Sequence, residues 1–172
     1  MAHRLWRIVA KLLPGDAPRP RSRYQQPSRT AESTRMGLIL DSSVVIAAER
    51  RGDTPAQLVA QIAAFTGDQQ AALSAVGLTE LVHGIYRADT TERRIHRQQF
   101  VQELRAGLTV YPYTEQTALL AGKIDGEQTA RGVVIPFPDL LIGATALSLG
   151  FAVLTSNVRH FNLIPDLAVV SF

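Results

Sequence analysis

The sequence predicts an α/β protein in which helices cover both faces of a central, mainly parallel sheet of about five strands. Helical segments alternate with short runs of β-forming residues from residue 37 onward, and this alternation is typical of a parallel sheet. The chain has 172 residues, of which 46% are hydrophobic, and this is enough for one domain with a sizeable core. Because no repeat or internal linker divides residues 36–172, we expect this range to form one three-layer α/β/α domain.

Capping and turn residues indicate where the elements begin and end. Ser42 or Ser43 can cap the first helix, and Pro55 suits the start of the second. Gly107 and Gly150 follow two later helices and can end them. The expected strands are 38–40, 71–76, 108–111, 151–154 and 167–170, and the expected helices are 44–50, 55–65, 79–88, 91–106, 114–130 and 138–149.

Residues 1–35 differ in composition from the rest of the chain. They hold eight of the 18 Lys and Arg residues but two of the 15 Asp and Glu residues, so they carry a net charge of +6 and residues 36–172 carry −3. We expect a short amphipathic helix over 1–13 and disorder over 14–35, which are rich in Pro, Arg, Ser and Gln. An alternative expectation is that Met36 is the true start, because it directly precedes the first strand. In either case the basic charge of the whole chain is no evidence that the folded domain binds nucleic acid.

The absence of cysteine excludes several kinds of site. A chain without Cys has no disulfide framework, no thiolate zinc site and no cysteine nucleophile, and it fits a reducing compartment. No apolar run in the sequence approaches the length of a membrane span, which is about 20 residues. We therefore expect a cytoplasmic protein without a membrane partner.

Three acids stand near the ends of predicted strands. Asp41 directly follows the first strand, at the sheet edge where open α/β proteins bind ligands, although an Asp there can also simply cap the next helix. Glu80 and Asp139 stand early in predicted helices, where the helix dipole alone favours a carboxylate. The helix after Asp139 is so apolar that it must be buried, and an acid at the start of a buried helix needs a partner.

Taken together, these acids predict a metal site. Carboxylates gathered at one edge of a sheet repel one another and require a cation. Oxygen ligands without Cys or a partner His favour Mg²⁺ or Mn²⁺ over Zn²⁺. Because Mg²⁺ is commonly bound by one or two carboxylates together with substrate phosphate, we expect phosphodiester chemistry.

Four segments resemble the sequence blocks of PIN domains. They are LILDSSVVI at 38–46, LTELVHG at 78–84, PDLLIGATA at 138–146 and LTSNVRHF at 154–161. The blocks occur in the right order across residues 37–171, and the closest kind is the VapC toxin of bacterial toxin–antitoxin pairs. The resemblance implies a PIN-like fold over 36–172 and a Mg²⁺- or Mn²⁺-dependent endoribonuclease that cleaves RNA, forms a homodimer and is silenced by a cognate antitoxin.

The resemblance also implies roles for individual residues. Asp41, Glu80 and Asp139 would be the catalytic, metal-binding carboxylates. Ser43 would be a hydroxyl that orients a carboxylate or a water molecule.

The fourth block departs from the family pattern, which usually has another acid there. This chain has Asn157 in that region, with Thr155 as a supporting hydroxyl and His160 nearby. An Asn can accept a metal or water through its carbonyl oxygen but adds no charge. The departure leaves open whether the site holds one metal ion or two.

Other charged residues on predicted helices are further candidates. Arg93, Arg94 and Arg97 could contact RNA phosphates, and Glu49 or Glu127 could contact substrate. A solvated helix position is the favoured explanation for the two glutamates, and a solvated face or a partner contact explains the arginines at least as well as RNA does.

Two other classes of protein also have an Asp after the first strand. A haloacid-dehalogenase-like phosphatase needs a second Asp two residues later, where this chain has Ser43. A non-catalytic, receiver-like binding module needs a Lys near the later strands, and Lys123, the only Lys after residue 35, lies inside a predicted helix. Neither class is favoured, and no base-reading motif indicates the RNA target.

Overall fold

The computed structural model describes residues 37–67 and 69–172. The helix expected over 1–13, the disorder expected over 14–35 and the alternative start at Met36 lie outside these residues. Among the described residues, no helix combines the length and the apolar character that crossing a membrane would require.

Five strands form one sheet in which every neighbouring pair is parallel. The strands are β1 (Leu38–Leu40), β2 (Ala71–Ser74), β3 (Thr109–Tyr111), β4 (Ala152–Thr155) and β5 (Val169–Ser171). Their order is β3-β2-β1-β4-β5, so β2 and β3 are added on one side of β1, and β4 and β5 are then added on the other side. The prediction of a parallel sheet of about five strands is confirmed, and β1 and β4 flank its topological switch point, where ligands of open α/β sheets bind.

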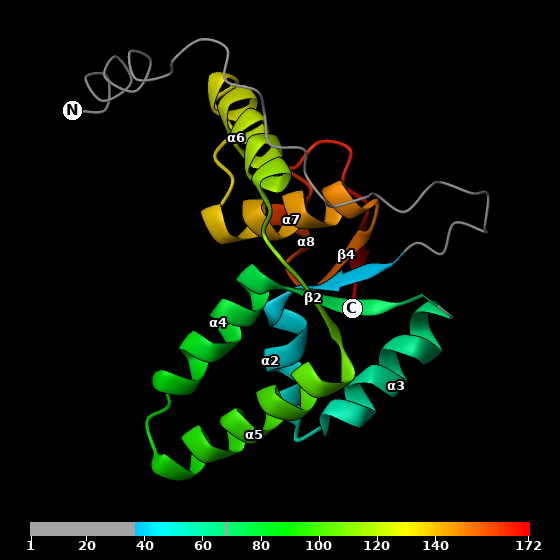
Figure 1. Cartoon of the computed structure of the whole chain (residues 1–172), viewed down its shortest axis with the longest axis vertical. Helices are drawn as coiled ribbons and strands as arrows, with labels where there is room; N and C mark the ends of the chain where they lie inside the picture. Colours follow the sequence, from blue (N-terminus) through cyan, green and yellow to red (C-terminus); the bar gives the residue numbers. More distant parts are fainter. Residues whose placement is uncertain (1–36, 68) are drawn as a thin grey trace, which may run out of the picture. The chain divides into compact units, whose positions relative to one another are not determined.

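Helices cover both faces of this sheet, as predicted. They are α2 (Ser42–Arg51), α3 (Pro55–Thr66), α4 (Ala75–Tyr86), α5 (Thr91–Gly107), α6 (Glu115–Ala130), α7 (Phe137–Leu149) and α8 (Val158–Phe161). Helices α2 to α5 lie on one face of the sheet and α6 to α8 on the other (Figure 1). Alternate side chains of a strand point to opposite faces, so Leu38 and Leu40 enter the core beneath α2 to α5, while Ile39 enters the core beneath α6 to α8. Burial on both faces explains why β1 is a continuous apolar run.

Two local expectations were wrong. The strand expected over 71–76 ends at Ser74, and α4 begins at Ala75 instead of residue 79. The reason is a cap, because the Ser74 hydroxyl accepts a hydrogen bond from the Gly77 N–H at 2.9 Å and so satisfies a free donor of the helix start. The four-residue helix α8 was not expected, since it is too short to show helical periodicity.

Candidate active site

Asp41 lies between β1 and α2, at the carboxyl end of the sheet. Its backbone N–H donates to the Leu154 carbonyl at 3.0 Å, which ties it to β4. The residue is 4% exposed, and its side chain makes no capping hydrogen bond to α2, so a capping role does not explain this acid. Instead, Oδ2 accepts hydrogen bonds from Ser43 Oγ at 2.5 Å and Thr155 Oγ1 at 2.7 Å. The other carboxylate oxygen has no hydrogen-bond partner among the described residues and is available to a ligand.

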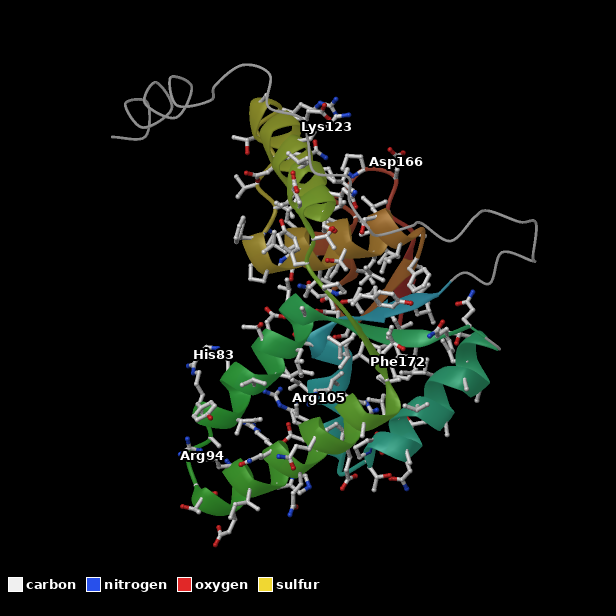
Figure 2. The ribbon with its side chains drawn as sticks, viewed as in Figure 1. His83, Arg94, Arg105, Lys123, Asp166 and Phe172 are labelled. Carbon is white, nitrogen blue, oxygen red and sulfur yellow. The ribbon has the colours of Figure 1, made fainter. Side chains whose placement is uncertain are left out.

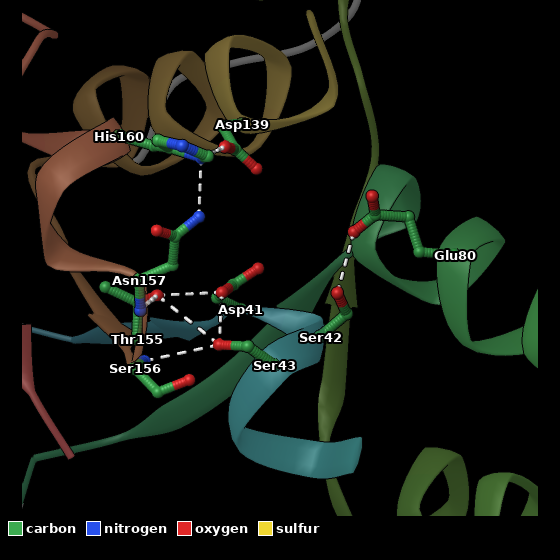
Figure 3. Close-up of polar contacts among 9 residues, drawn as sticks. All are labelled: Asp41, Ser42, Ser43, Glu80, Asp139, Thr155, Ser156, Asn157 and His160. Carbon is green, nitrogen blue, oxygen red and sulfur yellow. Dashed lines mark hydrogen bonds and ion pairs between the residues drawn. The ribbon is translucent and has the colours of Figure 1, made fainter. Parts of the chain in front are cut away.

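Backbone contacts hold the two hydroxyls that orient Asp41 (Figure 3). Thr155 is fully buried at the end of β4, and its Oγ1 accepts from the Asn157 N–H at 2.8 Å. Ser43 Oγ accepts from the Ser156 N–H at 3.2 Å. Each hydroxyl is thus fixed on one side by the backbone and donates to the carboxylate on the other. The structure therefore brings the predicted Ser43 and Thr155 to Asp41.

Glu80 lies in the second turn of α4, where its Oε2 accepts a hydrogen bond from Ser42 Oγ at 2.9 Å. The expected position in the first helical turn was wrong, because α4 begins at Ala75, so the helix dipole does not account for this acid. Burial raises the pKa of the Glu80 carboxyl above its ordinary value, and the charges of Asp41 and Asp139 add to the rise. The Ser42 hydrogen bond lowers the same pKa without cancelling the increase.

Asp139 lies in the first turn of α7 and contacts His160, the partner that its position required. Its Oδ2 is 2.8 Å from His160 Nδ1, and the Asp139 side chain is 15% exposed. Burial raises the pKa of Asp139, as does the charge of Asp41, whereas the hydrogen bond and charge of His160 lower it. The net direction is upward, so the imidazole only partly offsets the loss of water around this carboxylate.

His160 also connects Asp139 to Asn157. Its Nδ1 lies 2.5 Å from Asn157 Nδ2 as well as 2.8 Å from Asp139 Oδ2. A single ring nitrogen cannot donate to the carboxylate and accept from an amide at once. Because an ionised Asp139 can only accept, we assign the proton to Nδ1 and turn the amide oxygen of Asn157 toward the ring. Asn157 thus supports His160 and has no hydrogen bond to Asp41 through its side chain.

The three carboxylates surround one space at the carboxyl edge of β1 (Figure 3). Asp41 raises the pKa of both other acids, and Asp139 raises that of Glu80, so the charges lie close enough to repel. Within residues 37–67 and 69–172, no ion pair joins Lys or Arg to any of the three. In the same residues, no three His, Cys, Asp or Glu side chains are gathered tightly enough to hold a metal ion together.

Sequence reasoning missed two contacts of the site. Ser42 was considered only as a helix cap, yet it binds Glu80, and its place beside Asp41 in the first block was the available signal. His160 received no role because α8, which carries it, was not expected. Its spacing of three residues from Asn157 would have put both on one side of that helix.

Comparisons with known proteins find a matching family model, similar sequences and similar folds. Residues 38–166 match the family model of the PIN domain. A protein named Ribonuclease VapC from Rickettsia bellii is 32% identical over 136 residues, which are 79% of this chain and 96% of the relative. A VapBC2 structure from Rickettsia felis, bound to a DNA fragment from their promoter, superposes with a TM-score of 0.69 at 20% identity and covers 80% of this chain and 99% of that one. A member of the VapBC family of toxin–antitoxin systems from Mycobacterium tuberculosis gives a TM-score of 0.59 at 24% identity, over 80% and 97% of the two chains. At these identities the two structures show the fold alone.

Proposed function

The chain belongs to the PIN domain family, and from this premise we propose that it is a VapC-type ribonuclease, the toxin of a toxin–antitoxin pair. One observation carries the proposal: Asp41, Glu80 and Asp139 face one another at the switch point of the sheet, and each of the latter two has a raised pKa. Clustered acids with perturbed pKa values are typical of catalytic sites. The relative from Rickettsia bellii, named as a ribonuclease, supports the same activity.

The donor atoms at the site fit a hard divalent cation. They are carboxylate and hydroxyl oxygens, which suit Mg²⁺ or Mn²⁺, and the carboxylates lack a Lys or Arg partner among the described residues. Mg²⁺ needs one or two carboxylates and retains several waters, so a tight cluster of three acids is not required. We propose Asp41 and Asp139 as the main ligands and Glu80 as the third acid, with Ser43, Thr155 and Asn157 in support.

The reaction we propose is hydrolysis of an RNA phosphodiester. A bound divalent ion would polarise the phosphate and lower the pKa of a water molecule. Glu80 accepts a proton from the attacking water, a role favoured by its raised pKa, because a base works best when its pKa approaches the working pH. The water oxygen bonds to phosphorus, the bond to the ribose 3′ oxygen breaks, and that oxygen takes up a proton. The products are a 3′ hydroxyl and a 5′ phosphate.

Cleavage of single-stranded RNA by the purified chain tests this proposal. Wild type should cleave with Mg²⁺ or Mn²⁺ and stop with a chelator. Asp41→Asn and Asp139→Asn should abolish cleavage and remain folded, because each removes a repelling charge. Asp53→Asn is the matched control, since Asp53 pairs with Arg51 on the surface. Full activity in either site variant, or phosphatase activity on a small ester without RNA cleavage, would contradict the assignment.

The partners follow from the same proposal. A site of carboxylates is a receptor for Arg, whose planar fork bonds such groups, so we propose that the antitoxin presents Arg or Lys to Asp41 and Asp139. Excess Mg²⁺ should then weaken inhibition, because cation and Arg compete for the same oxygens. The homodimer and the cytoplasmic location remain predictions, which sedimentation and cell fractionation can test.

A further inference from the structure

A cavity of about 360 Å³ adjoins the proposed catalytic acids. It lies between α2, α4 and α5, and it shares Glu80 with the site. Its volume falls within the range of roughly 300–1,000 Å³ that is typical of ligand pockets. We call it the Arg97 cavity, and its walls are largely apolar, formed by Val45, Ile46, Leu81, Phe100 and Val101.

Both basic and acidic side chains line this cavity, which has three arginines and two glutamates, Glu49 and Glu80. Three of the ten Lys and Arg residues in 36–172 line it, namely Arg50, Arg87 and Arg97. Arg50 and Arg87 are exposed, and neither forms an ion pair with another described residue. Other basic side chains lie elsewhere (Figure 2): Arg94 stacks on Tyr86, and Lys123 pairs with Glu127 on α6. Arg97 pairs with Glu49, so Arg50 and Arg87 are the two arginines at the cavity that suit an anionic ligand.

A fixed donor and acceptor line the same cavity. Arg97 Nε donates to Glu49 Oε1 at 3.0 Å, and Arg97 Nη1 donates to the Gly84 carbonyl at 2.9 Å. These contacts hold both side chains but leave Glu49 Oε2 and Arg97 Nη2 without a hydrogen-bond partner among the described residues. The pair alone could serve to join α2, α4 and α5. A purely structural role does not explain why Arg50 and Arg87, which have no ion-pair partner in 37–67 and 69–172, border the same cavity.

We propose that the Arg97 cavity holds the base of an unpaired RNA nucleotide beside the scissile phosphate, with a backbone phosphate at Arg50 and Arg87. The proposal rests on the ribonuclease function above and specifies how that substrate is held. Proteins recognise single-stranded RNA by taking splayed-out bases into apolar surroundings and hydrogen-bonding their edges, and Arg forms strong bonds to phosphate. Glu49 offers an acceptor and Arg97 a donor, so guanine fits best, because its edge presents adjacent N–H donors beside a carbonyl oxygen.

The test is cleavage of a randomised single-stranded RNA pool, followed by sequencing of the cut ends. We expect wild type to prefer guanine at one fixed position next to the cut and Glu49→Gln to lose that preference. The double variant Arg50→Gln/Arg87→Gln changes only exposed residues, so it should fold normally, which a thermal melt can check. It should raise KM more than it lowers kcat, and it should reduce the salt slope of log(kcat/KM) by about 0.7, the value for one lost phosphate contact on a single strand. Arg131→Gln, an exposed arginine outside the cavity, is the control and should match wild type.

Three results would overturn the proposal. In the first, wild-type cleavage depends on Asp41, Glu49→Gln removes no base preference, and the double variant has an unchanged KM. The nuclease assignment then stands, but the cavity does not bind the substrate. If the double variant cleaves normally but escapes inhibition by the cognate antitoxin, the cavity binds protein instead of RNA. If no Asp41-dependent cleavage occurs, both the cavity proposal and the proposed function are wrong.

Discussion

Glu49 and Glu80 line the same cavity, yet their charges have different surroundings. The Glu49 side chain is 17% exposed and pairs with Arg97 at 3.0 Å. Glu80 receives only a serine hydroxyl, and two other acids raise its pKa. The charge of Glu49 is compensated by the arginine beside it. The charge of Glu80 has no such partner among the described residues. The comparison favours Glu80 over Glu49 for the catalytic role that we propose.

The three acids of the site also differ from Glu49 in the kind of side chain that contacts them. The three acids are oriented by uncharged hydroxyls and by one imidazole, whose charge only partly offsets the effect of burial on Asp139. Such an arrangement costs stability, because desolvated like charges repel. Proteins retain this kind of local cost mainly where function requires it.

Between the two glutamates, the larger expected effect is on catalysis by Glu80→Gln. The substitution keeps the size of the side chain but removes the proton acceptor, so kcat should fall by roughly 10²–10⁴-fold, the usual contribution of a general base. Glu49→Gln should act on KM and base preference instead. Steady-state cleavage of RNA separates these effects, with exposed Glu115→Gln on α6 as the control. A Glu80→Gln enzyme within twofold of wild type would remove the distinction between the two glutamates.

His160 provides the next largest effect, because its Nδ1 contacts Asp139, a proposed metal ligand. His160→Leu should weaken Mn²⁺ binding and activity by roughly 10–100-fold, the range for residues that orient metal ligands. His160→Asn should restore much of both, since its amide can donate to Asp139 from nearly the same place as Nδ1. Mn²⁺ titration of the two variants checks this. Equal losses in both would mean that the ring acts by packing alone.

Glu49→Ala should affect stability more than Glu80→Gln does. It leaves the half-buried Arg97 without its carboxylate, and we expect a loss of about 1–2 kcal/mol in the free energy of unfolding, near the lower end for an unsatisfied polar group because Arg97 retains some contact with water. Chemical denaturation measures the difference. An unchanged stability would show that the Glu49–Arg97 pair contributes nothing to the fold.

The smallest expected effect is a gain in stability from Glu80→Gln in the metal-free protein. Folding raises the pKa of Glu80 above its ordinary value of 4.5, so the folded state favours the protonated carboxyl. The resulting stability is fully present below about pH 4.5 and is lost as the pH rises through the folded-state pKa. Glutamine does not titrate, so the variant should melt higher than wild type at about pH 8 and nearly equally at about pH 4. Thermal melts in a chelator measure both. A variant that melts lower at about pH 8 would mean that the Ser42 hydrogen bond outweighs burial and repulsion.

The sequence predicted the fold well because burial leaves a clear pattern. The apolar run before Asp41 indicated a strand covered on both faces, and the alternation of elements indicated the parallel sheet. The position of Asp41 after the first strand likewise indicated the sheet edge where Thr155 meets it. These inferences depend on local sequence and on general rules of α/β topology.

Contacts between distant segments were harder to predict. Glu80 binds Ser42 across 38 positions and Asp139 meets His160 across 21, and neither pairing leaves a periodic signal. The start of α4 was misplaced because a single serine cap extended the helix by four residues. The Glu49–Arg97 pair joins two helices that the sequence treated as separate solvated faces.

Mn²⁺ binding to the isolated chain tests the central claim most directly, because it requires neither the RNA target nor the antitoxin. Isothermal titration should detect Mn²⁺ uptake by wild type and by Asp53→Asn, whose acid pairs with Arg51 away from the site. Asp139→Asn should lose at least about tenfold in affinity, since it removes a proposed ligand and not only an outer contact. If Asp139→Asn binds Mn²⁺ as tightly as wild type, the three acids do not form the metal site and the account of this protein as a metal-dependent nuclease is wrong.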